Sequence, residues 1–461
     1  MGGRKMRVRR GACVVWIGLL GTAVPALSAT PPTTEQMWAV IQQQQKTIEE
    51  LKARLESTEQ SARAAGQKAE TAGKQAEAAG QQAAEASEQV EESVSAAEAK
   101  APSWTGRTRI GGYGELHYNN WRNDTANTTK DEVDFHRFVI FLGHQFNDRI
   151  RFHSEIEIEH ALIGDDDGSS FAGSQNNKPG ELELEQAYIE ADVFGHHRLR
   201  AGLQILPIGI LNETHEPATF YGVERNLVES SILPTTWWEA GLGMSGEVWP
   251  ERLPGLGYDL VVHSGLQTAT TGGNAFRVRQ GRQKVAEAPA NDMAFTGRLK
   301  YTGLPGIEVG VAGQYQADIT GSGFAEDIPA SLVEAHTVIR KGPFGLRALV
   351  ARWDLAGGPA ATGPAGGPSD GRDVQFGWYL EPSWKFDLVG PLPGAIGIFG
   401  RYSETDNNAG DQSLAATRIE RWDVGFNWWP HEDVVFKFDY QDEHNGSDND
   451  GFNLGIGYQF F

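Results

Sequence analysis

The sequence predicts a transmembrane antiparallel β-barrel of about sixteen strands, preceded by an α-helical coiled coil. Three observations lead to this all-β fold class. Segments of about ten residues alternate apolar and polar side chains, and the links between these segments alternate short with long. A separate Ala-rich region near the N-terminus carries a heptad repeat. The expected divisions are a signal peptide over 1–29, a coiled coil over 30–102 and a barrel over 103–461.

The composition suits a large β protein and excludes several function classes. The chain of 461 residues holds 56 Gly, 13 Trp, 21 Phe and 11 Tyr, as expected for antiparallel strands with aromatic girdles. A formal net charge of −21 disfavours nucleic acid as a partner. Cys13 is the only cysteine and lies in the segment expected to be removed. Disulfides, cysteine metal clusters and cysteine catalysis are therefore excluded from the mature chain.

The first 29 residues have the three parts of a secretory signal peptide. A basic stretch with Arg4, Lys5 and Arg7 precedes an apolar run that is too short to span a bilayer. Small residues then end the segment, and we expect cleavage after Ser28 or Ala29. A retained membrane anchor is the less favoured alternative.

A heptad can be written from Thr34 to Ala97 with almost no break. Its first third carries large aliphatic side chains at the a positions, at Ile41, Ile48 and Leu55, and its middle carries alanine. A seam sustained over this many heptads predicts a coiled coil. The alternative is a single Ala-rich helix that serves as a spacer, because alanine has a high helix propensity without any partner.

Short alternating runs begin at Arg109. One example is Ile150–Glu159, in which Ile156 and Ile158 face one way while Glu155 and Glu157 face the other. Such runs have the length of about ten residues that a tilted strand needs to cross a bilayer. The chain ends in an aromatic stretch, Tyr458–Phe461, in which Phe461 is one residue out of phase with the apolar set.

The links sort into two kinds. Short, turn-rich links are predicted at 147–148, 194–196, 303–306, 341–343, 390–393 and 429–431. Long polar links are predicted at 121–131, 162–180, 267–290, 356–372, 404–414 and 442–450. Outer-membrane barrels have this arrangement, with tight periplasmic turns and long external loops.

The longest candidate loop runs from Pro207 to Pro234, between two strands of clear period-two pattern. Loops of this length are uncommon in compact domains and are usually functional or disordered. If the first strand runs outward from a periplasmic N-terminal region, this segment is the third external loop. We expect it to fold into the lumen and narrow a pore.

Four segments carry a resemblance to a known family. They are DFHRFVIFLGHQFNDRIRFHSEIEIE (134–159), LEQAYIEADV (184–193), LRAGLQILPIGILNETHEPATFYGVERN (199–226) and GLGMSGEV (241–248). The barrel region resembles the phosphate-selective porin O and P family, and the chain with its coiled coil is similar to the DcaP-like porins within it. The resemblance implies a homotrimeric channel in the bacterial outer membrane, surrounded by lipid and lipopolysaccharide, for diffusion of small, anionic solutes.

The expected lumen face carries both signs of charge. The candidate pore-lining residues are Arg137, Arg151, Glu155, Glu157, Arg298, Lys300, Arg340, Arg401, Arg421 and Lys437. Rings or rows of such charges can select ions, although most of them are expected to pair with one another. Because no continuous cationic ladder can be matched, phosphate selectivity is the less favoured interpretation.

Candidate residues of the constriction loop are Glu216, Glu224 and Arg225, with Phe220 and Tyr221 packing the loop against the wall. We expect no cofactor and no metal site. The acidic clusters in the predicted external loops can hold divalent cations in principle, but plain solvation is favoured. No catalytic motif such as GxSxG is present, so an enzyme is not expected.

Two hypotheses of different classes remain. The first is a porin for passive diffusion, and the second is an envelope-tethering protein whose barrel is only an anchor and whose coiled coil is the functional part. The long third loop favours the porin, because an anchor needs no constriction and only about eight strands. The identity of the solute stays open at this point.

Overall fold

The computed structural model describes residues 34–35, 38–39, 41–50, 52–57, 59–60, 63, 66–68, 70, 74, 105–123, 127–163, 180–321, 327–356, 372–390, 393–410, 417–445 and 448–461. The predicted signal peptide lies outside these residues. So do the cluster Asp165–Asp167 in the second long link and most of the predicted loop 356–372. The chain divides into two units, Met1–Ala99 and Lys100–Phe461.

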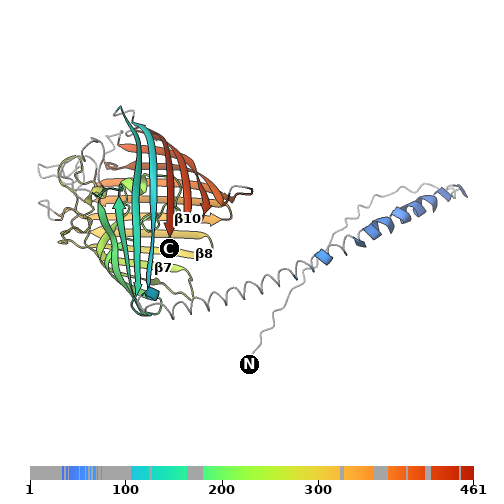
Figure 1. The fold of residues 1–461 in the computed structure, drawn as a ribbon, viewed down its shortest axis with the longest axis horizontal. Coiled ribbons are helices and arrows are strands. Elements are labelled where there is room, and N and C mark those ends of the chain that lie inside the picture. Colours follow the sequence, from blue (N-terminus) through green and yellow to red (C-terminus); the bar gives the residue numbers. More distant parts are fainter. Residues whose placement is uncertain are drawn as a thin grey trace, which may run out of the picture. The chain divides into compact units, whose positions relative to one another are not determined.

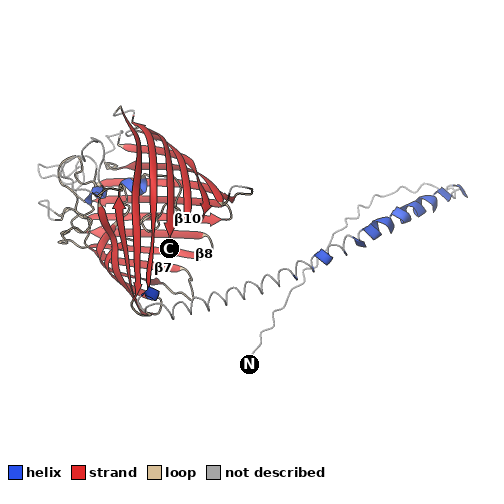
Figure 2. Cartoon of the chain, viewed as in Figure 1, coloured by secondary structure: helices blue, strands red, loops and turns tan. Residues whose placement is uncertain are grey.

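In the N-terminal unit, the described residues between 34 and 74 are helical and exposed (Figure 2). Ile41, Ile48 and Leu55, the large a-position side chains of the heptad, are 44%, 51% and 61% exposed in the single chain. The pairing of these helices into a coiled coil stays a prediction.

In the described part of the second unit, a 3-10 turn, η1 (Thr105–Arg107), leads into sixteen strands. The first eight are β1 (Thr108–Asn123), β2 (Thr128–Gln145), β3 (Ile150–Glu159), β4 (Leu182–Phe194), β5 (His197–Ile205), β6 (Trp238–Glu247), β7 (Leu256–His263) and β8 (Ala294–Leu304). The other eight are β9 (Ile307–Gln316), β10 (Ala330–Lys341), β11 (Phe344–Leu355), β12 (Val374–Asp387), β13 (Ala395–Asp406), β14 (Arg418–His431), β15 (Val434–His444) and β16 (Asn449–Phe460).

These strands form one closed barrel (Figure 1). Each strand pairs with its sequence neighbour in antiparallel register, and β16 returns to β1 from Gly112↔Phe460 to Asn123↔Asn449. Closure gives every strand two partners and leaves no free edge, which is the condition for strands to cross a hydrocarbon layer. The predicted barrel of about sixteen strands is confirmed.

Short and long links alternate around most of the barrel, but two predicted long links, 121–131 and 442–450, are wrong. These segments are mostly strand, because β1 ends at Asn123 and β2 begins at Thr128, while β15 ends at His444 and β16 begins at Asn449. Short links at 195–196, 305–306, 342–343 and 432–433 lie at one end, and long links such as 206–237 and 264–293 lie at the other. One predicted turn is misplaced, because β14 continues through His431 and the turn falls at 432–433. Trp428 remains in the ladder opposite Phe436, and the register shifts between Trp428 and His431 at Pro430, which has no N–H to donate.

Side chains alternate between the two faces of the wall. On β8, Leu299 points outward and is 55% exposed, whereas its neighbour Arg298 points inward and is 5% exposed. Glu155 and Glu157 point inward on β3, as predicted. The last residue, Phe461, stacks its ring on Phe141 with centroids 6.0 Å apart.

Candidate functional site

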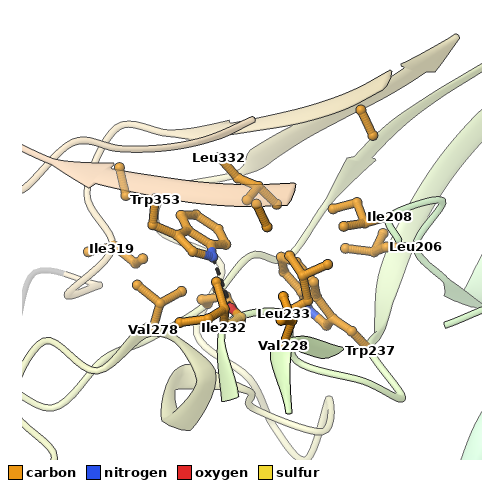
Figure 3. Packing of buried hydrophobic residues seen from close by; sticks show 14 of the residues in the cluster. Leu206, Ile208, Val228, Ile232, Leu233, Trp237, Val278, Ile319, Leu332 and Trp353 are labelled. Atoms are coloured by element: carbon orange, nitrogen blue, oxygen red, sulfur yellow. Dashed lines mark hydrogen bonds between the residues drawn. The ribbon is translucent and has the colours of Figure 1, made fainter. Parts of the chain in front are cut away.

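The link between β5 and β6, residues 206–237 and here called L3, packs inside the barrel. Its two ends contribute apolar side chains to a cluster of buried residues, including Ile208 near the start and Ile232 and Trp237 near the end. The inner wall contributes Leu332 from β10 and Trp353 from β11 (Figure 3). We call this set the anchor cluster; its members are Leu206, Ile208, Ile210, Val228, Ile232, Leu233, Trp237, Val261, Leu266, Ala275, Phe276, Val278, Ala312, Ile319, Ile328, Ala330, Leu332, Val338, Leu349, Ala351, Trp353, Leu355 and Tyr379.

The anchor cluster was not predicted from the sequence. In the sequence, inward-facing apolar residues on β10 and β11 cannot be distinguished from lipid-facing ones. A period-two pattern separates the two sides of a strand but does not show which side points into the lumen. Burying these side chains against L3 supplies the hydrophobic free energy that keeps a long loop inside the barrel.

Two buried polar side chains fix the path of L3 at its base. Asn212 donates to Leu206 O at 2.7 Å and accepts from Trp237 N at 2.6 Å, so it joins the two ends of the loop. Glu229, in the short helix α2 (Val228–Ser231), accepts from Ile210 N and Leu211 N at 2.7 and 2.6 Å. Backbone groups that no strand partners are thereby satisfied, as burial requires.

The middle of L3 is bound to the wall through its backbone carbonyls. Wall side chains donate to a run of consecutive residues, 218–222, and to His215. The donors and acceptors are Arg137 to His215 O, Trp429 to Ala218 O, Arg347 to Thr219 O, Asn427 to Phe220 O, Arg401 to Tyr221 O and Lys437 to Gly222 O. The donors belong to β2, β11, β13, β14 and β15, so much of the barrel circumference holds the loop.

The candidate aromatic residues of L3 pack as expected. Phe220 is buried, and the Lys437 ammonium lies 3.5 Å from its ring centroid. Tyr221 stacks on Phe399 at 5.3 Å and meets Trp429 edge-on at 5.6 Å. Both rings therefore attach the loop to the wall.

The two candidate glutamates of L3 differ in their surroundings. Glu224 accepts from Asn119 at 2.9 Å and lies 3.3 Å from the His117 ring nitrogen. Burial acts to raise the pKa of Glu224, but His117, with smaller contributions from His136 and Asn119, outweighs burial and holds that pKa well below its usual range. Glu216 lines a cavity described below.

Most of the predicted pore-lining cations are paired with carboxylates. Arg137 donates to Glu115 at 2.5 Å, and Arg401 bridges Asp423 and Glu381 at 2.9 and 3.0 Å. The remaining pairs join Arg151 to Glu190 and Asp192, Arg298 to Asp259 and Glu213, and Arg421 to Asp423 and Glu443. Lys300 and Arg340 make no side-chain hydrogen bond or ion pair with the residues that the structure describes, and each lines a hollow at the short-link end.

Arg225 differs from the wall cations. It forms no hydrogen bond or ion pair with any described residue. Its charge acts on Arg279 of the link 264–293, called L4, as do the charges of Arg277 and Arg282 of the same link, and we call these four residues the arginine group. Burial, together with the charges of Arg282, Arg225 and Arg277, lowers the pKa of Arg279 to about 10. Four like charges held together in this way would be stabilised by an anion.

The L4 arginines were missed because the sequence predicted a free external loop at 267–290. In the structure, L4 enters the lumen: Arg279 donates to Ser230 O of L3 at 3.0 Å, and Gln375 of β12 donates to Phe276 O at 2.8 Å. Val278 of L4 lies in the anchor cluster. The apolar pair Phe276 and Val278 between polar residues is the one sequence signal that pointed to this packing.

Carboxylates of the inner wall lie near one member of the arginine group, Arg282. Glu157, Glu159, Glu183 and Glu185 of β3 and β4 act on Arg282, and their charges partly offset the lowering of its pKa by burial. Lys284 of L4 pairs with Glu181 at 2.6 Å and also with Glu183.

A cavity of about 820 Å³ lies between L3 and the β1–β5 wall. Its lining includes His153, Tyr188 and Arg200 from the wall and Glu213, His215 and Glu216 from L3. Arg109 and Phe461 also line it, so the cavity lies toward the short-link end of the barrel.

A family comparison decides the class of the protein. The sequence model of the family "Phosphate-selective porin O and P" matches residues 109–451, which is nearly the whole barrel. The chain belongs to this porin family. The barrel and the family together make it an outer-membrane porin.

This porin is similar to several known proteins. An uncharacterised protein of Aquifex aeolicus (strain VF5) is 27% identical over 370 residues, covering 76% of this chain and 79% of its own. The OmpF porin of Salmonella typhi, solved in complex with daunomycin, has a TM-score of 0.51 at 13% identity over 77% of this chain and 97% of its own. The DcaP channel of Acinetobacter baumannii has a TM-score of 0.47 at 14% identity over 77% and 97%. Among the described residues of the porin, no helix is long and apolar enough to cross a membrane.

Proposed function

We propose that this porin carries small hydrophilic anions by passive diffusion through a lumen that L3 narrows. The observation that carries the proposal is the arginine group Arg225, Arg277, Arg279 and Arg282, which stands on L3 and L4 while the wall cations are largely neutralised by their own carboxylates. A channel discriminates where its passage is narrowest and charges are least screened. Unpaired arginines at that place favour anions.

L3 suits the role of a constriction because it is held rigidly. Seven of its backbone carbonyls accept hydrogen bonds from wall side chains, and its base is buried in the anchor cluster. A loop fixed in this way keeps its charges at a constant position in the passage. An envelope tether would need no such arrangement.

We further propose that the long links face the exterior, that the N-terminal region lies in the periplasm as a coiled coil, and that the porin is a homotrimer in contact with lipid and lipopolysaccharide. Orientation follows from the rule that outer-membrane barrels place short turns on the periplasmic side. The heptad seam of the N-terminal helix supports self-association, because its exposed a-position side chains lose water when helices pair.

The deciding experiment is the reversal potential of the wild-type channel in a planar bilayer under a potassium chloride gradient. We expect conductance and a reversal potential of the sign that marks chloride as the more permeant ion. Replacing 217–223 by a shorter Gly-Ser linker should raise the conductance, since this removes the wall-bound middle of L3 and leaves the anchor cluster in place. A folded protein without conductance would support the tether instead, and cation preference would reject anionic selectivity alone.

A further inference from the structure

Three side chains from separate parts of the chain meet beside the cavity under L3. Glu155 of β3, Glu185 of β4 and His215 of L3 are each at most 3% exposed. His215 Nε2 lies 3.3 Å from Glu155 Oε1 and 3.7 Å from Glu185 Oε2, and the three atoms lie within 4.8 Å of one another. None of these three atoms makes a hydrogen bond with the described residues.

Hydrogen bonds to their other polar atoms orient two of these three atoms, His215 Nε2 and Glu155 Oε1, toward each other. His215 Nδ1 lies 3.0 Å from Asn212 O, and because a carbonyl only accepts, Nδ1 carries the hydrogen. Nε2 is then the nitrogen that faces the carboxylates. Gln186 donates to Glu155 Oε2 at 2.5 Å, which leaves Oε1 turned toward His215. Partners of this kind behind the ligating atoms are typical of metal-binding histidines and carboxylates.

We propose that Glu155, Glu185 and His215 form a binding site for one divalent cation of the zinc class, which ties L3 to β3 and β4. One imidazole nitrogen and two carboxylate oxygens are a donor set that Zn²⁺ uses. For metal–ligand distances of about 2.0–2.1 Å, tetrahedral geometry places ligand atoms about 3.3–3.4 Å apart. The observed separations of 3.3 and 3.7 Å from Nε2 are close to that spacing. The cavity lined by Glu155 and His215 leaves room for a water as fourth ligand.

When no metal is bound, His215 Nε2 carries a proton that faces the two carboxylates. Burial favours the neutral ring, but Glu155 and Glu185 outweigh it and raise the pKa of His215 to about 10. A metal ion must displace this proton, because a coordinating histidine nitrogen is unprotonated. Binding therefore releases protons and strengthens as the pH rises.

Another group of metal-ligand type lies on β2 and just past β3 and serves as a comparison. His136 and His160 both direct Nδ1 to Asp134, at 3.3 and 2.8 Å. These atoms already have partners and are partly exposed, so this group lacks the buried atoms without hydrogen bonds that mark the proposed site of Glu155, Glu185 and His215. It can still bind a metal ion weakly, and an experiment must distinguish that binding from binding at the proposed site.

The test is calorimetric titration of the metal-stripped, full-length porin with zinc chloride in detergent, without a polyhistidine tag. We expect one site per chain, with proton release that varies with buffer ionisation enthalpy. Glu185→Gln and His215→Gln should each weaken this site by about 10–100-fold or more. The control His136→Gln/His160→Gln should bind as the wild type does, and heat-modifiable mobility on gels verifies that each variant is folded.

Cobalt(II) absorption of the His136→Gln/His160→Gln protein gives a second readout that needs no change at the proposed site. Intense visible bands of four-coordinate cobalt are expected at one equivalent. Three outcomes would each overturn the proposal: the wild type has no tight zinc site, folded Glu185→Gln keeps the site, or the control variant loses it. If the wild type has no such site, the protonated His215 ring alone joins L3 to Glu155 and Glu185 of the wall.

Discussion

The Lys437 ammonium lies 3.5 Å from the centroid of the Phe220 ring and, through the same nitrogen, donates to the carbonyl of Gly222 at 2.8 Å. Lys437 belongs to β15 and Phe220 to the middle of L3, so one wall side chain holds the loop by a cation–π contact and a hydrogen bond at once. Both are shielded from water, which strengthens them.

Lys437→Met should therefore destabilise the barrel by about 1–3 kcal/mol, since it removes both interactions and leaves the Gly222 carbonyl without this donor. Thermal unfolding in detergent measures the effect. Lys341→Met, at the exposed end of β10, is the matched control and should change the unfolding temperature little. Equal effects of the two substitutions would mean that Lys437 contributes nothing specific to holding L3.

Arg225→Glu should shift the reversal potential toward cations, because it reverses a charge that forms no ion pair with any described residue. Arg252→Glu, in the exposed short link between β6 and β7, makes the same change at the opposite end of the barrel. Its effect should be small at physiological salt, where screening acts over about 8 Å. If both variants shift ion selectivity by the same amount, the arginine group is not where the channel discriminates between anions and cations.

The phase of the strands is tested by two neighbours on β8. Leu299 faces outward and sits near the middle of the strand, so Leu299→Arg should cost roughly 2–4 kcal/mol in a bilayer. Lys300 faces inward without an ion pair to the described residues, and Lys300→Gln should be nearly neutral. Folding yield into lipid vesicles and urea unfolding report both. A reversed ranking would contradict the assigned faces.

The His215 interaction predicts a pH-dependent stability of the metal-stripped porin. The pKa of His215 is about 10 when folded, against 6.5 for a free histidine. A raised folded pKa gives stability that is complete below about pH 6.5 and is lost as the pH rises toward 10. The loss should be on the order of a few kcal/mol. Melting curves between about pH 6 and 10 should show this slope in the wild type and in His431→Gln, and a smaller slope in His215→Gln.

Deletion of 34–97 should leave a folded barrel whose trimer dissociates at lower temperature. The Ala-rich middle of the heptad would bury little area, so in the proposed homotrimer we expect the helices to add only modestly to contacts between the barrels. Native gels at rising temperature measure the dissociation, and light scattering in mild detergent gives the mass. Unchanged dissociation would make the helix a spacer, and a monomeric wild type would reject the trimer.

The sequence by itself determined the barrel and the place of its inward loop. Strands such as Ile150–Glu159 and Ala294–Leu304 follow from period two, which is a local property of the chain. L3 was identified by its length and its order among the long links. The wall positions of Arg137, Arg401 and Lys437 also followed, because alternation within one strand fixes which side chains share a face.

The tertiary structure alone decided what these residues touch. Nothing local marks Leu332 and Trp353 as inward-facing partners of L3, or shows that L4 enters the lumen, since both depend on barrel closure and loop packing. The meeting of Glu155, Glu185 and His215 likewise depends on the β3–β4 register and on the path of L3. The period of apolar residues and the composition are properties of the linear sequence. The pairing of distant charges depends on strand register and burial, which exist only once the barrel has closed.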